Sequence, residues 1–214
     1  MCPSRPPGNT DPWRPGCPTM TTLPNIPERH RAHRPAPVQW LGRRILDAGG
    51  WNVAGRVPDD PKLIIAGGPH TSNWDFVFAM AAILALDIRV HWLAKHSIFK
   101  PVVRPLLVGL GGIPVNRSQP GGVAEDIARR IREADEMIIA ITPEGTRSRV
   151  ARWKTGFLRI ARATPCAVVP VTLDFDRKEI RLWPPETASE DPEEDIERVR
   201  AIFARAMPKR PENF

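Results

Sequence analysis

The sequence predicts an α/β fold: a single domain in which a mixed, mostly parallel sheet is flanked by helices. Short apolar runs rich in β-forming residues alternate with segments of helical periodicity, which is typical of strands joined by crossover helices. The chain has 214 residues, 42% of them hydrophobic, which is enough for one compact domain with a substantial core. No internal repeat divides it.

Residues 1–36 are expected to form a disordered N-terminal tail, leaving 37–214 as the folded domain. Ten of the 25 prolines lie within residues 1–38, and this stretch has too little apolar surface to become ordered. It contains no hydrophobic stretch of the kind that a signal peptide needs, and Met20 is an alternative start to Met1.

The expected elements begin with a helix over 38–46, where aliphatic residues recur on one face and arginines lie on another. Two short stretches rich in β-forming residues, 51–56 and 62–66, are expected to be strands joined by a turn. The next helix covers the apolar run 76–86, because the Ser-Asn-Trp-Asp sequence before it has the spacing of a capping box.

The second half of the chain repeats the alternation of strands and helices. Its expected elements, in order, are a strand over 90–94, a helix that follows Gly121-Gly122 and runs to about Ala134, a strand over 137–142, a helix over 156–163, strands over 166–175 and 179–183, and a last helix. The last helix starts at Asp191, a good N-cap, with Pro192 in its first position and acidic residues in its first turn.

The segment 99–110 carries apolar residues at helical spacing, with Lys95, Lys100 and Arg104 nearby. This pattern suits a helix lying on a membrane surface, and it equally suits a helix packed on the sheet. Pro105 would bend or split either helix because it removes a backbone donor. Both interpretations stay open.

The charge of the chain is uneven. The net charge is +7, seven acidic residues crowd into 186–197, and residues 147–162 contain six basic residues and no acid. A basic surface of this kind attracts anions, among them phospholipid head groups, coenzyme A, acyl carrier protein and nucleic acid. Charge alone therefore does not name the partner.

The cysteines Cys2, Cys17 and Cys166 form neither a metal motif nor a disulfide framework, so we expect no metal and a reducing, cytoplasmic setting. The longest unbroken apolar stretch, 76–86, has 11 residues, whereas a membrane-spanning helix needs about 20. We therefore expect the protein not to cross a membrane.

His70 and Asp75 are the candidate catalytic pair. His70 follows a predicted strand, and Asp75 lies five positions later in the first turn of the next helix, where it can face the imidazole. A carboxylate on one ring nitrogen fixes the tautomer and leaves the other nitrogen free to accept a hydroxyl proton. The alternative is that Asp75 only caps the helix and His70 fills a turn.

Two further clusters suit anion binding. A turn at Gly112 leads into a short strand that delivers Arg117 to its end, and a guanidinium suits a phosphate monoester. Glu144 and Arg147 emerge together from a turn that Gly145 allows. The alternatives are an ordinary surface arginine and a plain strand-to-loop turn with solvated charges.

Taken together and in this order, the clusters resemble the glycerolipid acyltransferase family, whose best-known members are the 1-acylglycerol-3-phosphate acyltransferases. Four family blocks match: the His-x4-Asp box at His70 and Asp75, the Gly-rich arginine block at Gly112 and Arg117, the Pro-Glu-Gly-Thr-Arg block at Pro143 to Arg147, and the hydrophobic proline block at Val169 and Pro170. The resemblance covers residues 50–175.

The resemblance implies transfer of a fatty acyl group from acyl-CoA or acyl-ACP to the hydroxyl of a lysophospholipid-like acceptor, of the lysophosphatidate type, in phospholipid biosynthesis. It implies that His70 is the general base, oriented by Asp75, with the acyl thioester as co-substrate and no other cofactor, metal or covalent acyl-enzyme. The implied substrate-binding residues are Gly112, Arg117, Glu144, Gly145, Thr146 and Arg147.

Departures from the family leave the acceptor open: Pro69, Pro114 and Thr142 stand where many members have Asn, an aromatic residue and Phe. Without a hydrophobic N-terminal anchor, peripheral membrane attachment would depend on 38–46 and 99–110.

Three rival functions share some of these features. A nucleic-acid-binding protein would use the same positive charge, but the seven tryptophans are scattered and no recognised nucleic-acid motif is present, so we expect no nucleic acid. A hydrolase would need a nucleophile elbow, and the chain has none. A catalytically silent lipid-binding protein stays open.

Overall fold

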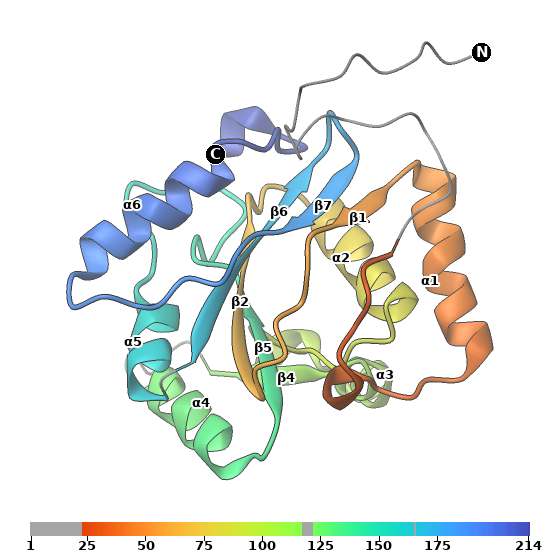
Figure 1. Ribbon diagram of the computed structural model, residues 1–214, viewed down its shortest axis with the longest axis horizontal. Helices are drawn as coiled ribbons and strands as arrows, with labels where there is room; N and C mark the ends of the chain where they lie inside the picture. The colour runs from red at the N-terminus through yellow and green to blue at the C-terminus, as the bar shows by residue number, and fades with distance from the viewer. Residues whose placement is uncertain (1–22, 117–121, 165) are drawn as a thin grey trace, which may run out of the picture.

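The computed structural model of the protein has one seven-stranded sheet with helices on both faces (Figure 1). The structure describes residues 23–116, 122–164 and 166–214. The strand order is β1-β7-β6-β2-β5-β3-β4, and every neighbouring pair is parallel except β6 and β7. The predicted single α/β domain with a mostly parallel sheet is confirmed.

The bounds of the elements follow the chain. The strands are β1 (Asn52–Ala54), β2 (Lys62–Gly68), β3 (His91–Lys95), β4 (Gly112–Val115), β5 (Met137–Ile141), β6 (Ala167–Asp174) and β7 (Glu179–Leu182). The α-helices are α1 (Ala36–Gly49), α2 (Asn73–Ala85), α3 (Arg104–Gly109), α4 (Gly122–Glu133), α5 (Gly156–Ala163) and α6 (Pro192–Phe203). Short 3-10 turns are η1 (Glu28–His30), η2 (His96–Ile98) and η3 (Pro211–Asn213).

The sheet separates two hydrophobic cores. On one face α1 and α2 pack over Leu63, and on the other α4, α5 and α6 pack over Ile64. Because neighbouring residues of β2 face opposite cores, this central strand is apolar on both sides, as in other parallel sheets covered by helices. Gly42 lets α1 approach α2 closely, since a β-carbon there would lie 2.7 Å from the carbonyl oxygen of Ala81.

The two strands expected from 51–56 and 62–66 are present, but they are not neighbours. β1 pairs with β7 at the edge of the sheet, whereas β2 lies between β6 and β5. The difference has a physical reason. The apolar β2 needs helices over both of its faces, while the short β1 alternates exposed and buried residues and suits an edge.

The expected tail boundary at residue 36 is wrong for the part of it that the structure describes. Ile26 is only 4% exposed and lies in the core under α1 and α2. His30 is 2% exposed and contacts the carbonyl oxygen of Pro58, while Arg34 donates to the carbonyl oxygen of Ile88 at 2.9 Å. A few anchoring side chains thus tie a proline-rich segment to the domain. The remainder of the expected tail, 1–22, lies outside the described residues.

The segment 99–110 does not form one helix. Pro105 lies in the first turn of α3, so the helix covers only the second half of the segment, as a proline without an N–H donor requires. Phe99 is buried and stacks on Trp92, with Leu107 packed beside them. Part of the predicted apolar stripe therefore faces the sheet, as the packed-helix interpretation required.

Candidate active site

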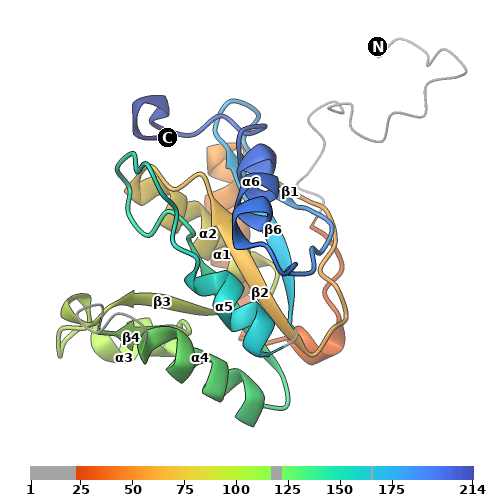
Figure 2. The same cartoon turned by 90° about the vertical axis from the view of Figure 1, so that its left-hand side faces the viewer.

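The predicted site clusters leave the sheet at one edge. β2, β5, β3 and β4 are parallel, so the residues that follow them emerge at the carboxyl ends of the strands, where α/β proteins place their sites. In Figure 2 the loop between β5 and α5 and the segment from β3 to α3 both lie on the left-hand side of the molecule.

The structure brings His70 and Asp75 together. Nδ1 of the imidazole lies 3.2 Å from Oδ2 of the carboxylate. The same oxygen accepts the backbone N–H groups of Thr71 and Ser72 at 2.7 Å each. Ser72 caps α2 by accepting from the N–H of Trp74, so the predicted capping box is confirmed. Asp75 therefore both caps its helix and contacts the histidine. The catalytic-pair and helix-cap interpretations of Asp75 are compatible with each other.

The environment of Asp75 keeps it ionised. Burial alone would raise its pKa, but hydrogen bonds from His70 and from the amides of Ser72 and Thr71 outweigh burial, and the pKa lies below its usual value. An ionised carboxylate only accepts hydrogen bonds, so Nδ1 of His70 carries the proton and Nε2 is the basic nitrogen. The imidazole is partly exposed, whereas the carboxylate is buried behind it.

Glu144 lies behind the histidine. Both of its carboxylate oxygens accept the backbone N–H of His70, each at 3.0 Å. The side chain is buried. Burial raises its pKa to about 7, the hydrogen bond from His70 opposes this rise, and the negative charge of Asp75 adds to it.

The loop between β5 and α5 exposes the last two residues of the Pro-Glu-Gly-Thr-Arg block. Gly145 has φ +68°, which favours glycine, and its N–H donates to the carbonyl oxygen of Thr142 in a tight turn. Thr146 and Arg147 follow this turn and are exposed. Arg147 forms no ion pair with any described residue, so its guanidinium is available to an anion.

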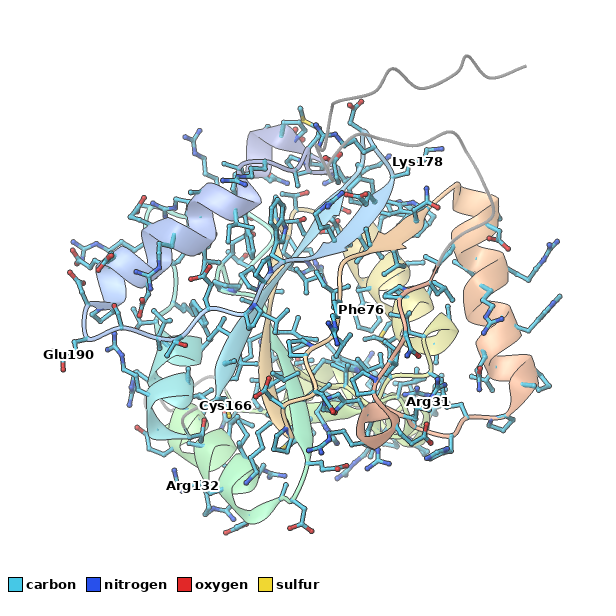
Figure 3. The ribbon with its side chains drawn as sticks, in the orientation of Figure 1. Arg31, Phe76, Arg132, Cys166, Lys178 and Glu190 are labelled. Atoms are coloured by element: carbon cyan, nitrogen blue, oxygen red, sulfur yellow. The ribbon has the colours of Figure 1, made fainter. Side chains whose placement is uncertain are left out.

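Most of the basic residues in 147–162 gather in one exposed loop of the structure. Of the six basic residues in 147–162, Arg159 pairs with Glu125 and Arg162 pairs with Asp195. The other four are exposed in the loop between β5 and α5 and form no ion pair with residues that the structure describes: Arg147, Arg149, Arg152 and Lys154. The acidic stretch lies at the start of α6, where Glu190 is at the margin of the molecule (Figure 3).

Gly112 does not reach the site. It opens β4 at the amino end of the strand, and β4 lies three strands from β2, about 14 Å away at the usual strand spacing. A β-carbon at Gly112 would lie 2.7 Å from the carbonyl oxygen of Leu107 and 2.9 Å from the Trp92 ring, so this glycine makes room for packing. β4 runs toward the site edge and ends at Val115, and Arg117 lies outside the described residues.

The C-terminal segment supports the histidine turn, which no sequence pattern had indicated. The N–H of Arg210 donates to Oγ1 of Thr71 at 3.2 Å, and the amide of Asn213 donates to the Thr71 carbonyl oxygen at 3.4 Å. Thr71 is the residue next to the imidazole and is buried. No local pattern could have revealed this contact, because its partners are 139 and 142 positions apart.

No group of three His, Cys, Asp or Glu side chains is arranged to hold a metal ion within the described ranges. The site consists instead of an imidazole, the carboxylate that orients it and nearby cations. A histidine oriented by a carboxylate at the carboxyl edge of an α/β sheet is an arrangement typical of enzymes that move protons.

Comparison with known protein families identifies the family to which the chain belongs. The model of the acyltransferase family matches residues 52–174, which is more than half of the chain. The chain therefore belongs to the acyltransferase family.

The fold is also found in a solved structure. The crystal structure of the 1-acyl-sn-glycerophosphate (LPA) acyltransferase PlsC from Thermotoga maritima is similar to this chain, with a TM-score of 0.57 and 19% sequence identity. The similarity covers 79% of this chain and 76% of that one. No curated protein matched the chain.

Proposed function

We propose that the protein transfers a fatty acyl group from acyl-CoA or acyl-ACP to the hydroxyl of a lysophosphatidate-like acceptor. The observation that carries this proposal is the 3.2 Å contact between His70 and an ionised, buried Asp75. The similarity to a 1-acyl-sn-glycerophosphate acyltransferase supports an acceptor that carries a phosphate.

The reaction follows from the protonation states. Nε2 of His70 takes the proton of the acceptor hydroxyl as its oxygen attacks the thioester carbonyl carbon, so the new C–O bond forms without a free alkoxide. Asp75 stabilises the resulting imidazolium. When the tetrahedral intermediate collapses, the C–S bond breaks and the imidazolium returns its proton to the departing thiolate. No acyl-enzyme forms.

The acceptor phosphate would be bound by the arginines of the two family blocks, Arg117 and Arg147. Arg147 is exposed on the loop after β5, and Arg117 follows β4 in the sequence. A guanidinium binds a phosphate through two parallel hydrogen bonds, so each is suited to the task. We expect Arg117→Ala to raise the acceptor KM more than it lowers kcat, since a phosphate clamp acts mainly in binding.

We also propose that the segment from η2 to α3 rests on a membrane surface. Several apolar side chains there face solvent: Ile98, Val102, Val103, Leu106 and Val108, with Val102 91% and Leu106 63% exposed. Lys95, Lys100 and Arg104 are exposed beside them and would meet anionic head groups. Phe99 anchors the segment to the core. In the part of the chain that the structure covers, no helix has the length and apolar character to cross a bilayer.

The test is an acyl-transfer assay with labelled acyl-CoA and acyl-ACP against a panel of lysolipids. We expect transfer to a phosphate-bearing acceptor, and loss of turnover in His70→Ala with the fold intact, because the imidazole lies at a strand end. His33→Ala removes an exposed histidine elsewhere and is the matched control. Undiminished activity of His70→Ala would rule out the base, and the absence of transfer to any acceptor would rule out the function.

A further inference from the structure

The main chain of His70 is held by a side chain from a different part of the sheet. Glu144 follows β5 and lies 74 positions after His70 in the sequence. Both of its carboxylate oxygens lie 3.0 Å from the backbone nitrogen of His70. Asp75 holds the imidazole of the same residue from α2. The histidine is therefore fixed at its backbone by one carboxylate and at its ring by another.

From this geometry we infer that Glu144 is a positioning residue for His70 and does not bind the acceptor. It sets the place of the histidine backbone relative to the sheet, and so the place where Nε2 meets the acceptor hydroxyl. The inference rests on the proposed acyl transfer, and it assigns Glu144 a different role from the substrate contact that the family block implies.

Two observations argue against a contact between Glu144 and the acceptor. The side chain is only 4% exposed, and its oxygens are directed at a backbone N–H. A phosphate brought close to this carboxylate would add a second negative charge in a poorly solvated place, which is unfavourable. The exposed Arg147 on the same loop suits the phosphate instead.

The positioning role requires an ionised Glu144, because a protonated carboxyl would lose acceptor capacity and gain a donor that needs a partner. The titratable groups that face Glu144 are His70 and Asp75, and Lys154 of its own loop lies beside Gly145. Since burial and Asp75 raise the pKa of Glu144 to about 7, the ionisation of this carboxyl changes with pH around neutrality.

The kinetic test compares Glu144→Gln and Glu144→Asp with the control Glu125→Gln, an exposed glutamate on α4. We expect kcat to fall about 10- to 100-fold in both Glu144 variants, with the acceptor KM unchanged, because a small misplacement of the base acts on the chemical step. A rise in acceptor KM at unchanged kcat would show that Glu144 binds the acceptor and overturn the inference.

A pH profile separates positioning from loss of structure. In the wild type, kcat should fall as the pH decreases through about 7, the pKa of Glu144, because this carboxylate must be ionised to hold the His70 backbone. In Glu144→Gln the position has no such proton, so this part of the acid limb should be absent. An identical acid limb in the two proteins would overturn the inference.

Amide hydrogen exchange tests the contact without any turnover. The His70 amide should be protected in the wild type and should exchange at least tenfold faster in Glu144→Gln, while amides in the centre of β2 stay protected. Unchanged exchange at His70 overturns the inference whatever the activity. If instead the His70 amide exchanges faster in Glu144→Gln but the wild type transfers no acyl group, the contact between Glu144 and His70 is supported and the proposed function is wrong.

Discussion

The carboxylate of Asp75 lies 3.2 Å from Nδ1 of His70 while it closes the capping box of the helix from which it projects. One side chain thus fixes both the start of α2 and the tautomer of the histidine. Because the two tasks share an atom, Oδ2, the position of the helix and the orientation of the base are coupled.

Separate substitutions test the carboxylate of Asp75 and the serine cap of the same helix. Asp75→Asn should lower kcat by about a thousandfold or more, since an amide no longer favours the imidazolium or the correct tautomer. Ser72→Ala removes the cap on the Trp74 N–H and the hydrogen bond from Ser72 Oγ to Oδ1 of Asp75, and should cost about 1 kcal/mol of unfolding free energy. It should leave kcat within a few-fold, because the N–H groups of Thr71 and Ser72 still hold Oδ2 of Asp75. Acyl-transfer kinetics measure the change in kcat for both variants, and urea denaturation measures the change in their free energy of unfolding. A large loss of kcat in Ser72→Ala would show that the cap itself carries the activity.

Gly112 should matter for stability. In Gly112→Ala the new methyl group meets the carbonyl oxygen of Leu107 and the Trp92 ring, so the free energy of unfolding should fall by about 1–3 kcal/mol. Gly109→Ala on α3 is the matched control, because no atom lies within 4 Å of its added carbon. Thermal and urea denaturation measure both. Stability equal to the wild type, with an increased acceptor KM, would instead support the family's assignment of Gly112 to the substrate.

Membrane contact should depend on the exposed apolar side chains of the segment from η2 to α3. Val102→Glu and Leu106→Glu should each reduce flotation with vesicles rich in anionic lipid, because a charge would have to enter the interface. Met207→Glu changes another exposed apolar residue and is the control. If neither substitution alters flotation, or if the wild type does not float, this segment is not the membrane contact.

The stability of the protein should depend on pH through Glu144. Its pKa rises from 4.5 to about 7 on folding, so the folded state holds this proton more tightly than the unfolded chain. The associated stability is present below pH 4.5 and is lost as the pH rises through 7. Between pH 5 and pH 8, the free energy of unfolding of Glu144→Gln should therefore increase relative to that of the wild type, by about 3 kcal/mol or less. Urea denaturation of both proteins at pH 5 and pH 8 tests this prediction. A difference in unfolding free energy between variant and wild type that is the same at both pH values would contradict it.

The local elements of the fold were predictable because their signals are local. The capping box at Ser72 and Asp75, the N-cap at Asp191 and the apolar run of β5 each depend on residues a few positions apart. Pro105 likewise predicted that the apolar segment before β4 would be split. Such features need no knowledge of the tertiary structure.

The remaining features depend on tertiary contacts that periodicity does not contain. Ile26 reads as part of a proline-rich tail until the core that buries it is known. Gly112 belongs to a family block, but the direction of β4 places it at the far end of the strand from the site. The orientation of Glu144 toward His70 follows from the neighbouring positions of β2 and β5, which the sequence does not specify.

The hydrogen bonds from Arg210 and Asn213 to Thr71 have a consequence for the order of folding. Their partners are 139 and 142 positions apart, so closing this loop costs conformational entropy before the contacts can repay it. The turn that carries His70 therefore gains these two hydrogen bonds only after distant segments of the chain have come together.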